Sequence, residues 1–132
     1  MELKKRQEDA VAQITSTEVS DDGVSISALS DMGRYGKVRF TLNLESSGDR
    51  SEGLAHGAGR GAMADGTFLA GSFTGRWARE GTKVVVHGID HVSNGDLSLL
   101  RFEFDAIEIT NTVTALMTTS SKKITEHILY VA

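Results

Sequence analysis

Apolar and polar residues alternate with a period of two along much of the chain. In the run KVRFTLNLE, at residues 37–45, every second side chain is apolar. A similar alternation follows the turn signal DDG at residues 21–23. Successive side chains of a strand point to opposite faces of a sheet, so this pattern predicts half-buried strands with one face on a core.

Further strand-like runs are separated by short turn signals rather than by helices. The turn signals are DG, REG and NG, and the runs lie at 54–63, 67–78, 83–92, 97–109, 112–117 and 124–132. Regular short strands with tight turns predict an all-β protein, an antiparallel up-and-down (meander) β-barrel of about eight strands. A β-sandwich is the alternative, because period-two patterning does not distinguish a closed sheet from two packed layers. We expect one domain over residues 1–132, with residues 1–14 as a short helix or an irregular arm.

The segment AHGAGRGAMADGTFLAGSFTGRW, residues 55–77, holds six of the fourteen glycines. Its G-x-G-x-G spacing matches neither the dinucleotide nor the P-loop fingerprint, and no helix is expected to begin after it. Glycine within a strand marks a bend, a bulge or the close approach of another group. The glycines are therefore predicted to shape the barrel rather than to bind phosphate.

The turn signals also predict a register. A two-residue turn at Asp65-Gly66 places Ala64 opposite Thr67, and one at 94–95 places Val92 opposite Leu97. The REG segment at 79–81 is expected to form a three-residue loop with a left-handed glycine at 81. Together these registers place one set of polar and aromatic side chains on the inner face, namely His56, Arg60, Phe73, Trp77, His87, His91 and Phe102.

The inner set is the predicted ligand-binding site, because a few polar groups within an apolar interior are typical of a small-molecule pocket. His87 and His91 are the candidate catalytic residues, since imidazole titrates near neutral pH. The alternative for each histidine is a structural hydrogen bond to a nearby carbonyl, or a position at an open end of the barrel. No carboxylate is expected to face the middle of this cavity; Glu108 comes closest, near one mouth. Ser98, beside His91, is only a weak candidate nucleophile.

The outer face is predicted to carry apolar side chains that a homo-oligomer, such as a dimer, would cover. These outward positions are Val84, Val86, Leu99, Ile107 and Ile109.

Composition and spacing remove several classes of function. The chain has 132 residues, no Cys and a net charge of −4, so thiolate chemistry is excluded and no basic stripe favours nucleic acid. HGIDH has its histidines four apart, which on a strand separates their backbones by roughly 13 Å, so no metal site is expected. No cofactor is expected either. The charged start MELKKRQEDAVAQI resembles no signal peptide and no apolar run is long enough for a membrane span, which predicts a cytoplasmic protein without a membrane partner.

The glycine-rich stretch 55–77 and the segment HGIDHVSNGD resemble small bacterial proteins of the allene oxide cyclase or dirigent barrel type, over about residues 15–117. That resemblance implies an eight-stranded barrel with an apolar interior, although the catalytic signature of neither family is matched. Members of this type include proteins that cyclise or isomerise hydrophobic compounds. The leading hypothesis is therefore binding of a small apolar or amphipathic molecule in the barrel, with isomerase or cyclase chemistry through His87 or His91. The alternative is a noncatalytic protein with a filled barrel and an outer face for self-association.

Overall fold

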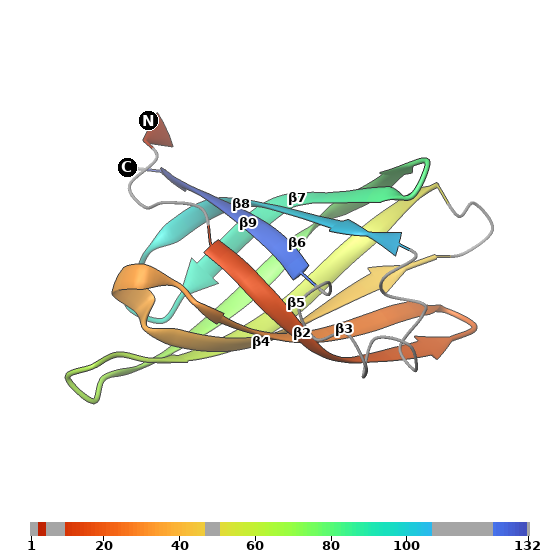
Figure 1. Ribbon diagram of the computed structural model, residues 1–132. Coiled ribbons are helices and arrows are strands. Elements are labelled where there is room, and N and C mark those ends of the chain that lie inside the picture. The colour runs from red at the N-terminus through yellow and green to blue at the C-terminus, as the bar shows by residue number, and fades with distance from the viewer. Residues whose placement is uncertain (1–2, 5–9, 47–50, 107–122, 132) are drawn as a thin grey trace.

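The computed structural model describes residues 3–4, 10–46, 51–106 and 123–131 of the chain. Strands account for about four fifths of these residues (Figure 1). In chain order the elements are β1 (Leu3–Lys4), β2 (Ala10–Ser20), β3 (Gly23–Asp31), the 3-10 turn η1 (Gly33–Tyr35), β4 (Lys37–Glu45), β5 (Glu52–Ala62), β6 (Phe68–Glu80), β7 (Lys83–Val92), β8 (Leu97–Asp105) and β9 (Lys123–Val131). The all-β prediction is confirmed.

Strands β2 to β8 form an antiparallel meander in which each strand pairs with the next along the chain. Strand β9 closes it, because β9 pairs with β8 on one side and with β2 on the other (Figure 1). The short strand β1 pairs with the far end of β9. The result is a barrel of strands β2–β9, as predicted, and this closure decides against two separate layers.

The start of the chain differs from its prediction. Residues 10–14 belong to strand β2, in which Ala12 and Ile14 are buried, so neither a helix nor an irregular arm describes them. The predicted strand at 112–117 lies outside the described residues, as do Glu108, Ile107 and Ile109. Within the described part of the chain, no helix has the length and apolar character to cross a membrane.

Two of the hairpin turns are one residue longer than predicted. Between β5 and β6 the Met63 N–H donates to the Thr67 carbonyl at 2.9 Å, which leaves a three-residue loop ending in Gly66 with φ +90°. Between β7 and β8 the Val92 N–H donates to the Asp96 carbonyl at 2.9 Å, and Gly95 has φ +97°. In each loop the glycine N–H closes a β-turn, and its positive φ returns the chain to the sheet. The predicted two-residue turns are wrong.

The third hairpin is shorter than predicted. Glu80 pairs with Lys83, so β6 and β7 are joined by a two-residue turn at Gly81-Thr82. The predicted positive φ of Gly81 is confirmed at +61°, but the three-residue loop is wrong. A glycine at the first position of such a turn matches the twist of the flanking strands.

These three turns together reverse the inner faces of β5 and β7. A register error of an odd number of residues moves a whole strand to its other face. Strands β6 and β8 keep their predicted orientation, with Phe73, Trp77 and Phe102 buried. The predicted outward positions Val84 and Val86 are instead core residues, 4% and 0% exposed, and that prediction is wrong.

Candidate functional site

The barrel interior contains a cavity of about 80 Å³. It lies toward the end of the barrel where η1 and the β5–β6 and β7–β8 hairpins meet, which we call the η1 end. Most of the wall is apolar and comes from strands β4, β5, β6 and β8. Its main lining residues are Met32, Tyr35, Val38, Phe40, Leu42, Gly57, Gly59, Gly61, Leu69, Gly71, Phe73, Asp90, Val92, Ser98, Leu100 and Phe102.

Inward glycines of β5 make one wall of this cavity thin. A Cβ at Gly57 would lie 2.4 Å from the Thr41 carbonyl oxygen, so here the β4 backbone itself approaches closely. A Cβ at Gly59 would lie 3.4 Å from the Phe40 Cβ, which leaves room for a methyl group. The predicted architectural role of the glycines is therefore confirmed at Gly57, where a side chain would collide with a neighbouring strand.

Three phenyl rings form the packed side of the cavity. The rings of Phe73 and Phe102 meet edge to face, with centroids 5.4 Å apart and planes at 83°. The ring centroid of Phe40 lies 5.5 Å from that of Phe102. The Phe73 ring packs over Gly88, where a Cβ would come within 2.5 Å of the ring. Glycine in β7 thus makes space for the ring that bounds the cavity.

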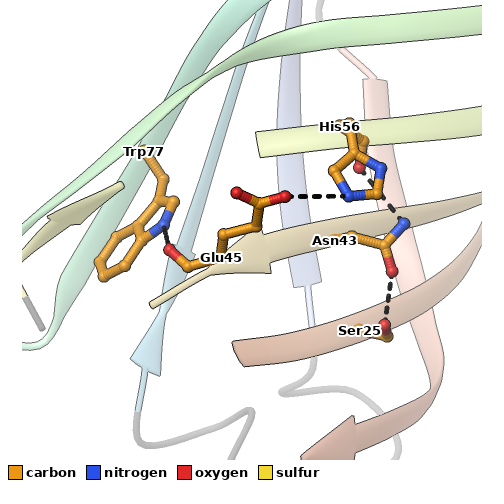
Figure 2. Close-up of polar contacts among 5 residues, drawn as sticks. All are labelled: Ser25, Asn43, Glu45, His56 and Trp77. Carbon is orange, nitrogen blue, oxygen red and sulfur yellow. Dashed lines mark hydrogen bonds and ion pairs between the residues drawn. The ribbon is translucent and has the colours of Figure 1, made fainter. Parts of the chain in front are cut away.

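Trp77 is inside the barrel as predicted but away from this cavity. Its side chain is 6% exposed, and the indole N–H donates to the Glu45 carbonyl oxygen at 2.7 Å (Figure 2). A Cβ at Gly53 would lie 2.7 Å from the indole nitrogen. The ring therefore fills the interior near the ends of β4 and β6 and does not line the cavity, so the geometry gives it no part in binding there.

Asp90 and Ser98 interrupt the largely apolar wall, and they face each other across a strand pair. Asp90 of β7 and Ser98 of β8 are Cα partners and both line the cavity. Ser98 is 2% exposed, and its Oγ has no hydrogen-bond partner. The Asp90 carboxyl makes no hydrogen bond within the described part of the chain. Buried polar groups are usually paired, so the unpaired hydroxyl of the buried Ser98 is unusual.

The environment of Asp90 changes its acidity. Burial in the apolar wall raises the pKa of this carboxyl to about 6, although the neighbouring His91 acts in the opposite direction. Gly71 accommodates the carboxyl, because a Cβ there would lie 3.1 Å from Oδ1. With a pKa this close to neutrality, Asp90 can accept hydrogen bonds as a carboxylate and can also carry a proton.

The expectation that no carboxylate faces the middle of the cavity is therefore wrong. Asp90 was overlooked because β7 has apolar residues on both faces, with Val84 and Val86 on one and Val85 and Ile89 on the other. Alternation alone cannot orient such a strand. Ser98 was correctly placed on the inner face, but its pairing partner is Asp90 rather than His91.

The four polar residues predicted to point inward all lie on the outer face. His56, Arg60, His87 and His91 are exposed. His56 pairs across the ladder with Thr74, and its Nε2 lies 3.6 Å from Glu45 Oε1 (Figure 2). The Arg60 Nη1 donates to the Gly59 carbonyl oxygen at 2.8 Å. Their predicted inward placement is wrong, because the longer β5–β6 loop turns the even-numbered residues of β5 outward.

Figure 2 also shows what surrounds His56 on this outer face. The Asn43 side-chain amide donates to the His56 carbonyl oxygen at 3.4 Å and accepts a hydrogen bond from Ser25. These contacts tie β3, β4 and β5 together on the surface. They form a solvated polar row rather than a pocket.

His87 and His91 cannot reach a molecule in the cavity. His87 pairs with Arg76 of β6 and Arg101 of β8, and all three are on the outside of the barrel. The geometry therefore does not support a catalytic role of these histidines inside the barrel. Within the described residues, no group of three or more His, Asp or Glu side chains gathers in a way that could hold a metal ion.

Comparisons with protein-family models, curated proteins and solved structures found no match. The resemblance to barrels of the allene oxide cyclase type stays a prediction.

Proposed function

We propose that this protein binds a small amphipathic molecule inside its barrel. The apolar part of the ligand packs against Phe73, Phe102 and the glycine wall of β5. Its polar end meets Asp90 and Ser98. The observation that carries this proposal is the buried Ser98 hydroxyl without a hydrogen-bond partner, beside the half-buried Asp90 carboxyl, on the wall of a largely apolar cavity.

The size of the cavity limits the ligand. An engineered apolar cavity of about 150 Å³ in another protein holds benzene. The present cavity is about 80 Å³. It therefore suits a molecule smaller than benzene, or the end of a longer chain. Core side chains such as Ile26, Trp77 and Val86 occupy other parts of the interior, so this barrel is intermediate between an open ligand barrel and a fully packed one.

The proposal is one of binding, without a reaction. A general acid or base must reach the proton that it transfers, and His87 and His91 are on the outer face. Among the described residues that line the cavity, Asp90 is the one Asp, Glu or His side chain.

The test is a titration of the ¹⁵N-labelled protein with 1-butanol, followed by amide NMR. We expect saturable shifts at Gly59, Gly71 and Ser98, with small changes at residues on the outer face. The cavity-filling variant Gly59→Ala should lose most of the affinity. The matched control is Ser72→Ala on the exposed side of β6, which should bind as the wild type does. Absence of saturable shifts at the cavity in the wild type would overturn the proposal.

A further inference from the structure

The cavity carries one charged group and no charged partner for it. Asp90 is the only ionisable Asp, Glu, Lys, Arg or His residue among the described residues that line it. The basic residue His91 follows Asp90 in the chain but is exposed on the outer face. Even a half-buried carboxylate is costly to a fold when it lacks a hydrogen-bonded countercharge. A ligand that supplied the missing cation would remove that cost.

The polar atoms of the wall are mainly hydrogen-bond acceptors. A carboxylate only accepts, and the free Oγ of Ser98 can accept as well as donate. The Tyr35 hydroxyl directs its proton to Asp96 Oδ2 at 2.8 Å. A matching ligand group therefore needs several donors on one atom. An ammonium group has three, an alcohol has one, and a carboxylate has none.

The groups that face Asp90 offer it no competing positive charge. From β6 it is approached by Gly71 and Phe73, and from β8 by Ser98. Thr41 and Tyr35 line the same cavity from β4 and the η1 connection. All of these are uncharged near neutral pH. Attraction between a carboxylate and a cation is strongest where such an apolar wall excludes water.

We propose that the cavity selects a small primary alkylamine in its protonated form. The ammonium group forms an ion pair with the Asp90 carboxylate and donates a second hydrogen bond to Ser98 Oγ, while the alkyl chain packs against Phe73 and Phe102. This inference rests on the proposed function and narrows it to one ligand class. The charge and the three donors of the ammonium group define the polar end of the ligand. The size of the cavity restricts the alkyl chain of the ligand to a few carbons.

The direct test compares three probes of the same length at pH 7.5: n-butylamine, 1-butanol and butyrate. Calorimetry or the amide shifts of Gly71 and Ser98 report binding to the wild-type protein. We expect n-butylamine to bind about tenfold or more tightly than 1-butanol, because a charge-assisted hydrogen bond replaces a neutral one. Butyrate should not bind. Equal binding of n-butylamine and 1-butanol would overturn the inference and leave the proposed function standing. Failure of both probes to bind would overturn both.

A variant pair identifies the residue responsible. Asp90→Asn keeps the shape of the side chain and removes its charge, so it should abolish the preference for n-butylamine while retaining 1-butanol binding. The matched control is Asp31→Asn, which removes one exposed carboxylate at the end of β3 and should change neither affinity. A preference that survives in Asp90→Asn would overturn the inference.

A pH titration of the wild type gives a second readout that needs no variant. The pKa of Asp90 is about 6 in the free protein, whereas an alkylammonium stays protonated at pH 5. The preference for n-butylamine over 1-butanol should therefore fall between pH 7.5 and pH 5. A preference that does not change over this range would show that another group binds the amine.

Discussion

Asp90 and Ser98 are direct partners across the β7–β8 ladder, and both side chains face the barrel interior without a hydrogen bond in the described part of the chain. The two strands bring the groups together because three hairpin turns set the register that turns the even-numbered residues of β7 inward. A serine hydroxyl could complete its hydrogen bonding with a neighbouring carboxylate, yet this one does not. Both groups are thus available to hydrogen-bond a bound ligand.

The free energy of unfolding should depend on pH through Asp90. Burial raises the pKa of this carboxyl from 3.8 to about 6, so between these values the folded state binds its proton more tightly than the unfolded chain does. The contribution of Asp90 to the free energy of unfolding is present at low pH and is lost as the pH rises through the pKa of this carboxyl in the folded state. Because the carboxyl is only partly buried and solvent screens it, we expect a loss of about 1–2 kcal/mol between about pH 4 and pH 7. Urea unfolding of the wild type and Asp90→Asn measures this, and a stability difference between them that is constant over the range would contradict it.

Two glycine substitutions should have opposite effects. Neither Gly59 nor Gly88 has a positive φ, so alanine is allowed by the backbone at both. Gly59→Ala meets only ordinary contacts and should be neutral or stabilising by about 0.5–1 kcal/mol. Gly88→Ala would place its Cβ 2.4 Å from the Thr74 carbonyl oxygen and against the Phe73 ring, and should destabilise by about 2 kcal/mol or more. Equal stabilities of the two variants in urea unfolding would contradict this account of the glycines.

Adjacent residues of β7 should respond differently to truncation. Val86 is 0% exposed, and Val86→Ala should lower the free energy of unfolding by about 2 kcal/mol. His87 is exposed, and His87→Ala should change it by no more than about 0.5 kcal/mol. Thermal or chemical unfolding of both variants checks the orientation of the strand. A large loss at His87 with none at Val86 would restore the register expected from the turn signals.

The η1 end of the barrel should loosen when one hydrogen bond is removed. Tyr35 is 8% exposed, and its hydroxyl joins the η1 connection to Asp96 of the β7–β8 hairpin. Tyr35→Phe should cost about 1–2 kcal/mol and speed amide exchange at Gly36 and Gly95. The control Thr82→Ala removes an exposed bond to a carboxylate at the opposite end and should leave exchange at those two glycines unchanged. Unaltered exchange in Tyr35→Phe would contradict a role for this bond in holding the end of the barrel.

Self-association stays a prediction, and one outer position tests it. Ile89 is 44% exposed and pairs with Leu99, which is half-buried on the same outer face. If a homodimer covers this face, Ile89→Lys should shift the protein toward monomer in sedimentation velocity. A wild-type protein that sediments as a monomer at high concentration would argue against the dimer.

The sequence by itself was sufficient for the fold class and for two of the strands that bound the cavity. In β6 the large apolar residues Phe73 and Trp77 alternate with small or polar ones, and β8 alternates in the same way around Phe102. In each of these strands the large apolar residues lie mainly on one face, so burial favours one orientation. The positive φ of Gly81 followed equally from local chemistry, since the turn needs a residue without a Cβ.

Only the tertiary structure decided how β5 and β7 face the interior, and with that the composition of the site. Strand β5 is mostly glycine and alanine, and β7 is apolar on both faces, so neither has a hydrophobic pattern that excludes the opposite orientation. Turn signals such as DG and NG are compatible with loops of two or three residues, and one residue of difference reverses every side chain. The choice depends on packing across the barrel. Closing the sheet through β9 and fitting Phe73 over Gly88 favours the register that buries Val86 and Asp90 and leaves His87 in solvent.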